Sequence, residues 1–111
     1  MIHIINEKAT KQQVQEMMEM LETYIKLAVD IEREILAGGG AMHADCEAIL
    51  LEDGSQQEYI WGVDWNPESQ EITFESLINI RPRQNNRSLE LQDPELRSKV
   101  EQVTRKLLGG V

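Results

Sequence analysis

The sequence predicts an α+β fold: an antiparallel meander of three to four strands, with a long N-terminal helix and a C-terminal helix packed on one face. Apolar residues recur at spacings of three and four between Val14 and Ile35, hydrophobic and polar residues alternate in three later segments, and a second helical stripe follows Asp93. A chain of 111 residues has the size of one domain, so we expect a single domain over residues 1–111.

The sequence is acidic, with 11 Lys and Arg against 20 Asp and Glu and a formal net charge of −9 at pH 7. Because phosphate binding draws on basic side chains, this balance argues against nucleic acid and against an anionic membrane surface as partners. Cys46 is the single cysteine, so no internal disulfide is possible, which suits a reducing compartment. With no signal peptide or transmembrane stretch in the sequence, we expect a cytoplasmic protein. We expect no cofactor, with a divalent cation as the one alternative.

The N-terminal third predicts a short strand followed by one long helix. Residues 2–5 form an apolar run, and Thr10 with Gln13 matches a capping box at which a helix begins. The glycines at 38–40 would end that helix at Ala37, because consecutive glycines hold helical geometry poorly. The apolar stripe of this helix would consist of Val14, Met17, Leu21, Tyr24, Ala28, Ile31 and Ile35.

A helix of this length would extend over about 40 Å, more than one small sheet requires. Two interpretations of its apolar stripe therefore stay open: packing on the protein's own sheet, or pairing with the same helix of a second copy in a homodimer. The methionines in this part of the chain suit either arrangement, since their flexible side chains adapt to irregular surfaces.

The middle of the chain predicts three antiparallel strands. Hydrophobic and polar residues alternate over residues 42–51, 59–65 and 72–80, and Asp-Gly and Asn-Pro pairs between them are typical of turns. In the first hairpin, a four-residue loop from Gly54 to Gln57 places Leu50 opposite Trp61. The same register places Ala48 and Cys46 opposite larger side chains, as close packing favours.

Pairing Trp65 with Ile72 across the next turn then brings together the few apolar residues on the otherwise polar face of the meander. These residues are Leu51, Ile60 and Leu77. Gathering them into one cluster supports the predicted register, because scattered exposed apolar residues would be less favourable.

The C-terminal segment predicts a polar loop and a second amphipathic helix. Asp93 followed by Pro94 is a typical helix start, with aspartate as N-cap and proline at the first helical position. The buried stripe of this helix is predicted to consist of Leu96, Val100, Val103 and Leu107.

The first candidate site consists of His43, Asp45, Glu47 and Asp64 on the polar face of the first predicted hairpin. Residues two apart on a strand point the same way with Cα atoms about 6.6 Å apart, so His43 and Asp45 could share one divalent cation. Asp64 would lie opposite Glu47 or Asp45, and such neighbouring carboxylates call for a cation, a shared proton or an arginine. The site is therefore a candidate metal or acid–base site; the alternative is a solvated acidic face.

The second candidate site is an arginine-rich loop, which carries Arg81, Arg83 and Arg87 with Asn86. Guanidinium groups bind carboxylates and phosphates bidentately, so this loop is a candidate anion site. The alternative is internal pairing with Glu52, Asp53, Glu58 or Asp93. In the predicted meander the loop lies roughly 25 Å from His43, so the two candidates would be separate sites.

Three segments carry a resemblance to a known family: DIEREILAGGGAMHADCEAILLEDGSQQEYIWG (30–62), INIRPRQNNRS (78–88) and DPELR (93–97). In these segments the chain resembles a family of small uncharacterised bacterial proteins with members in cyanobacteria. The resemblance implies a soluble bacterial protein of unknown function, and it implies no catalytic residue.

Two classes of function follow from the sequence. The first is a non-enzymatic binding or protein-interaction module that associates with itself or with another protein. The second is a small enzyme or a metal- or anion-binding protein that uses the acidic strand face or the arginine-rich loop. Cys46, predicted to face the core, would take no part in either.

Overall fold

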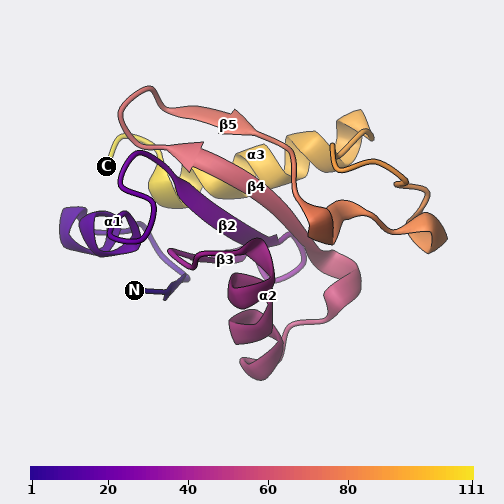
Figure 1. The fold of residues 1–111 in the computed structure, drawn as a ribbon, viewed down its shortest axis with the longest axis horizontal. Coiled ribbons are helices and arrows are strands. Elements are labelled where there is room, and N and C mark those ends of the chain that lie inside the picture. Colours follow the sequence, from indigo (N-terminus) through magenta and orange to yellow (C-terminus); the bar gives the residue numbers. More distant parts are fainter.

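The structure is a computed structural model that describes residues 1–111 and contains three α-helices and five β-strands (Figure 1). The strands form one sheet in the order β1-β3-β2-β4-β5, and every neighbouring pair is antiparallel. None of the helices combines the length and apolar character that a membrane crossing needs. The elements are β1 (His3–Ile5), α1 (Lys11–Met17), β2 (Ile25–Asp30), β3 (Ile35–Gly38), α2 (His43–Glu52), β4 (Ile60–Asn66), β5 (Glu71–Thr73) and α3 (Pro94–Leu108).

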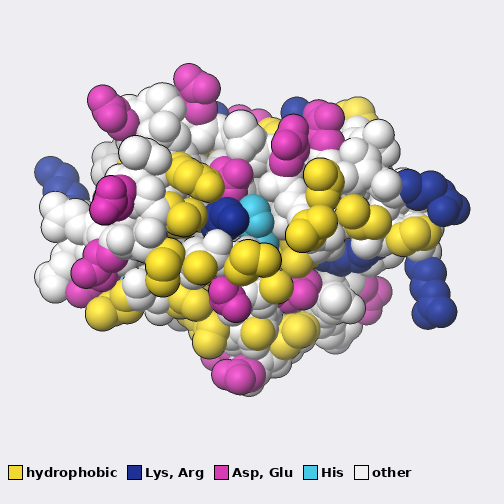
Figure 2. All heavy atoms as spheres, viewed as in Figure 1, with side chains coloured by type: hydrophobic (Ala, Val, Ile, Leu, Met, Phe, Trp, Pro, Cys, Tyr) yellow, Lys and Arg dark blue, Asp and Glu magenta, His cyan; other side chains and the backbone are white.

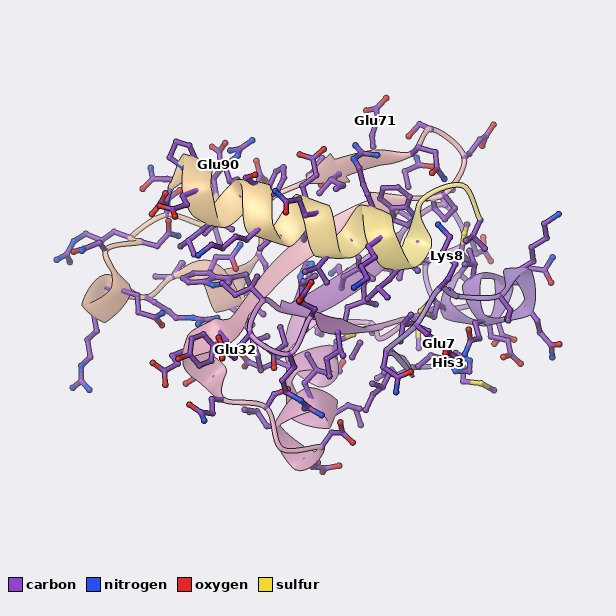
Figure 3. The ribbon with its side chains drawn as sticks, turned by 180° about the vertical axis from the view of Figure 1, so that it is seen from behind. His3, Glu7, Lys8, Glu32, Glu71 and Glu90 are labelled. Atoms are coloured by element: carbon purple, nitrogen blue, oxygen red, sulfur yellow. The ribbon has the colours of Figure 1, made fainter.

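Two of the helices cover opposite faces of the sheet. α3 runs behind the sheet in Figure 1 and in front of it in Figure 3, whereas α2 lies on the other side. Successive side chains of β4 point to opposite faces of the sheet, and each face has its own hydrophobic core. Trp61 lies in the core between the sheet and α3, and Ile60 lies in the core between the sheet and α2. α1 contributes Val14 and Met17 to the same core as α3, so the N-terminal and C-terminal helices contact one core as predicted. The prediction of three to four strands with one open polar face is wrong, because the sheet has five strands and α2 covers its other face, which gives the protein three layers.

The prediction of a long N-terminal helix is wrong, because the helix that begins at the Thr10 capping box ends at Met17. The following residues form the β2–β3 hairpin, in which Ala28 pairs with Ala37. Glu22 and Glu34 occupy the left-handed region at the connections, with φ of 68° and 55°. Glutamate is an uncommon residue at such positions, so the sequence carries no turn signal there and its apolar spacing resembles that of one continuous helix.

Residues 42–51 were predicted as a strand and instead form most of α2. The helix begins where the carboxylate of Asp45 accepts a hydrogen bond from the Met42 N–H at 3.1 Å. Cys46 and Leu50, four residues apart, are fully buried against the sheet. Polar and apolar residues also alternate here, so this stretch fits the two-residue period of a strand as well as the period of a helix. Its content of Ala, Leu and Glu, which are good helix formers, favours the helix.

The strand predicted at residues 59–65 is confirmed by β4, and its pairing of Trp65 with Ile72 is confirmed as well. The other neighbour of β4 is β2 rather than residues 42–51, so Leu50 does not pair with Trp61. The third predicted strand stops at Thr73 instead of continuing to residue 80. Beyond that point the chain leaves the sheet, and two short 3₁₀ turns follow at Leu77–Asn79 and Pro82–Gln84.

A side chain takes over the position that the third strand leaves open. The amide of Asn79 accepts a hydrogen bond from Gly62 N at 2.8 Å and donates one to Gly62 O at 2.9 Å. Asn79 is fully buried, so this pair of bonds continues the strand-like hydrogen bonding of β4 without a strand.

The two ends of the described chain follow the sequence prediction closely. β1 coincides with the predicted N-terminal strand, and Asp93 caps α3 by accepting a hydrogen bond from Glu95 N at 2.9 Å. The N-terminal segment is fastened to the end of α3: Ala9 N donates to Leu107 O at 2.9 Å, and the Lys8 ammonium donates to Gly109 O (Figure 3).

Candidate functional site

The strongest candidate site is a surface depression on the α2 side of the sheet, which we name the α2 hollow. Its volume is about 370 Å³, within the range of small-molecule pockets. Figure 2 shows this face, with a histidine beside a basic side chain and hydrophobic side chains on either side. The residues that line the α2 hollow are Tyr24, Lys26, Met42, His43, Ala44, Asp64, Glu75, Ser76, Leu77, Ile78 and Leu89.

The polar residues of the α2 hollow come from two paired strands and one helix end. Lys26 on β2 lies directly opposite Asp64 on β4, so both side chains project from the same face of the sheet. His43 is the first residue of α2, which packs on that face. Three residues distant in sequence therefore meet where the helix begins.

His43 and Asp64 form a defined pair. His43 Nε2 lies 2.9 Å from Asp64 Oδ1 and 3.1 Å from the Val63 carbonyl oxygen. Because both neighbours are acceptors, we assign the hydrogen to Nε2, and Nδ1 has no hydrogen-bond partner. The other carboxylate oxygen of Asp64 lies 3.4 Å from the Thr73 hydroxyl, so both oxygens face a donor.

Lys26 differs from Asp64 in having no partner. Its ammonium forms no ion pair within 4.0 Å and no hydrogen bond, although the side chain is partly buried. The cross-strand carboxylate that could neutralise it is engaged by His43 instead. The α2 hollow therefore contains a lysine ammonium with no direct ion pair, and Asp64 and Glu75 are the acidic residues of its lining.

An apolar rim surrounds these polar groups and consists of Met42, Leu77 and Leu89. Leu77 is 68% exposed, which is far more than a leucine packed in a core, and the other two are also exposed. Apolar side chains gathered around a few convergent polar groups are characteristic of ligand sites.

The chemistry of the α2 hollow favours binding over nucleophilic catalysis. A histidine oriented by a carboxylate can move a proton, but no nucleophile is hydrogen-bonded to His43. The Cys46 thiol donates to the Lys26 carbonyl at 3.5 Å, and burial raises its pKa above the usual value. Ser76 Oγ accepts a hydrogen bond from Ile78 N at 3.2 Å.

The structure brings together only two of the four residues in the first predicted site. His43 and Asp64 are paired, whereas Asp45 caps α2 and Glu47 points toward Arg81, with 3.9 Å between Glu47 Oε2 and Arg81 Nη2. No cluster of three or more His, Cys, Asp or Glu side chains is arranged to hold a metal ion. The strand geometry behind the predicted four-residue cluster is absent, because three of its members lie on a helix.

Arg81 of the second predicted site is built into the fold. Its guanidinium donates to the carbonyls of Ile78 at 3.0 Å and Gln57 at 2.6 Å, and it lies 4.2 Å from the centre of the Trp61 ring. Burial lowers the pKa of Arg81, while Glu47 opposes that shift. Arg81 is therefore paired inside the protein, as the alternative interpretation expected, but its partner is Glu47 rather than one of the four predicted carboxylates. Because Glu47 belongs to the first candidate site, the two candidate sites are in contact at this pair instead of being separate.

The remaining residues of the arginine-rich loop divide into a buried and an exposed group. The Asn86 amide is buried and donates to the backbone carbonyls of Asn79, Ser88 and Glu90 at 2.8 to 3.1 Å, so it organises the loop. Arg83 and Arg87 are exposed and make no ion pair. The loop therefore does not gather three guanidinium groups around one anion.

Sequence reasoning missed Lys26 and Tyr24, because both were assigned to the long helix. The segment from Ile25 to Asp30 does alternate, with Ile25, Leu27 and Val29 buried in the cluster of α3 and Lys26 on the other face. That alternation is the signal that could have placed Lys26 in a strand and beside Asp64.

Comparison with known proteins identifies the family. No curated protein and no solved structure matches the chain. The model of a family described as "Protein of unknown function (DUF5674)" matches residues 3–107, which agrees with the uncharacterised family expected from the sequence. Since this match covers nearly the whole chain, the protein belongs to the DUF5674 family.

Proposed function

We propose that the protein is a binding module whose ligand site is the α2 hollow. The observation that carries this proposal is the combination of an apolar rim with the convergent polar groups of Lys26, His43 and Asp64. The larger depression along α3, of about 870 Å³, lacks this combination, because polar and charged residues and Pro94 line it. A bacterial source and a cytoplasmic location stay predictions from the sequence.

Nuclear magnetic resonance with a fragment library tests this proposal. Fragments that bind are expected to shift the backbone amide signals of residues lining the α2 hollow, such as Lys26, His43 and Leu77. Substituting Ala44→Trp should abolish these shifts, because Ala44 is exposed and lines the hollow, so that the indole fills it.

Ala48→Trp is the matched control for the filled hollow. Ala48 lies one turn further along α2, is exposed and does not line the hollow. We expect this variant to bind the same fragments as the wild type. Fragments that shift signals elsewhere on the surface, or that bind equally well to Ala44→Trp, would refute the α2 hollow as the ligand site.

We infer a second candidate function, self-association through the apolar rim, from the exposure of Leu77. The long helix that could have formed a homodimer does not exist, and the residues of its stripe from Ala28 onward belong to the sheet or to its connection. A second copy on the rim would instead cover Leu77 and the α2 hollow.

Light scattering across a concentration series distinguishes self-association from ligand binding. A homodimer is expected to show twice the mass of one chain, and Leu77→Lys should return it to one chain by placing a charge in the interface. Leu51→Lys is the control, because Leu51 is an exposed leucine of α2 outside the α2 hollow. A wild-type protein that stays monomeric at every concentration would exclude this function.

A further inference from the structure

We propose that the ligand of the α2 hollow is a small amphipathic carboxylate, whose headgroup pairs with Lys26 and whose alkyl chain lies against the rim. This inference rests on the proposed function, since it names the ligand class of the same hollow. The α2 hollow would then bind a carboxylate more tightly than a neutral or cationic ligand with the same alkyl chain.

The charge distribution of the α2 hollow selects the headgroup. Lys26 is partly buried and has no ion pair, so a carboxylate brought to it gains a charge-assisted hydrogen bond that water screens only in part. The first turn of α2 opens onto the same hollow, where the N–H groups of His43 and Ala44 donate to no acceptor, and a helix N-terminus favours an anion further.

Asp64 and Glu75 are the acidic residues of the lining, and the assignment depends on how each of them is placed. Both oxygens of Asp64 lie near donors, one on His43 at 2.9 Å and one on Thr73 at 3.4 Å. Glu75 is exposed to water, which screens its charge. The Lys26 ammonium, which forms no ion pair within 4.0 Å, attracts a carboxylate and repels a cationic ligand.

The apolar rim selects the remainder of the ligand. Met42, Leu77 and Leu89 are exposed, and an alkyl chain laid against them removes apolar surface from water. The volume of about 370 Å³ suits a ligand of a few to about a dozen heavy atoms better than a folded partner domain. A free small molecule is therefore the occupant that the geometry favours.

A headgroup series tests the charge preference directly. The wild-type protein is titrated with octanoate, octanamide and octylamine, and the amide signals of the lining residues report the affinity for each. We expect octanoate to bind at least tenfold more tightly than octanamide and octylamine. Acetate, which carries the headgroup alone, is expected to bind at least tenfold more weakly than octanoate because it does not reach the rim.

Variants of Lys26 connect the preference to this side chain. Lys26→Met should lower the affinity for octanoate at least tenfold and change that for octanamide less than twofold, while Lys26→Arg, which keeps the charge, should retain the preference. Lys99→Met, at an exposed position of α3 outside the hollow, should change neither. The dispersion of the amide spectrum verifies that each variant is folded.

The outcomes separate this inference from the proposed function. If octanamide or octylamine binds in the α2 hollow as tightly as octanoate, the hollow is a ligand site and the assignment to carboxylates is wrong. The same conclusion follows if Lys26→Met keeps the preference for octanoate. If acetate matches octanoate, the site holds an adventitious ion only. If no member of the series shifts the lining amides, the assignment to amphipathic carboxylates is wrong, whereas the proposed function fails only if the fragment library also leaves these amides unshifted.

Discussion

Asn79→Ala is expected to lower the free energy of unfolding by about 3 kcal/mol, because it leaves two buried backbone groups without partners. The Asn79 amide is the partner of both the N–H and the carbonyl of Gly62, and it is fully buried. Its Nδ2 also lies near the carbonyls of Phe74 and Leu89, at 3.4 and 3.3 Å. One side chain therefore ties β4 to the loop that follows β5.

Urea denaturation measures this loss, with Gln56→Ala as the control. Gln56 is exposed and its side chain makes no hydrogen bond, so its removal should change stability by less than about 0.5 kcal/mol. A loss below about 1 kcal/mol for Asn79→Ala would contradict the argument, because it would mean that Gly62 finds other partners at little cost.

Arg81→Ala is expected to destabilise the protein by about 3 to 5 kcal/mol, as the removal of one member of a buried ion pair does. The side chains of Arg81 and Glu47 are 10% and 12% exposed. Glu47 Oε2 is buried without a hydrogen bond, and the substitution removes the cation that lies beside it. The substitution also removes the contact of the guanidinium with the Trp61 ring.

A second substitution isolates the role of the buried charge. Arg81→Ala combined with Glu47→Gln should be more stable than Arg81→Ala alone, because the double variant no longer buries an unpaired carboxylate. Arg83→Ala, at an exposed arginine without an ion pair, is the control and should change stability by less than about 0.5 kcal/mol. Equal midpoints of unfolding for Arg81→Ala and Arg83→Ala would show that the buried Arg81 contributes no more to stability than an exposed arginine.

The parts of the fold that could be predicted are those with a local chemical signature. The Thr10 capping box, the Asp93-Pro94 helix start and the Trp65–Ile72 pairing each depend on residues close in sequence, and the structure confirms all three. The β2–β3 hairpin could not be predicted in this way, because glutamate rather than glycine or asparagine adopts the left-handed conformation at Glu34.

The candidate site was predictable only in part for the same reason. Asp64 was expected opposite Glu47 or Asp45 on a hairpin, whereas it pairs with His43 through contact between a helix end and a strand. Lys26 became part of the site only when its segment formed a strand beside β4. A contact between elements far apart in sequence has no local signature, so periodicity alone could not reveal it.

The lengths of β1 and β5 have a consequence for how copies of the protein can meet. These two strands are the edge strands of the sheet, and each contains three residues. An edge strand this short offers few free backbone groups to a strand from another molecule, which disfavours edge-to-edge polymerisation. The sheet is therefore poorly suited to growth by strand addition, and contact with another molecule is left to the side chains of its faces.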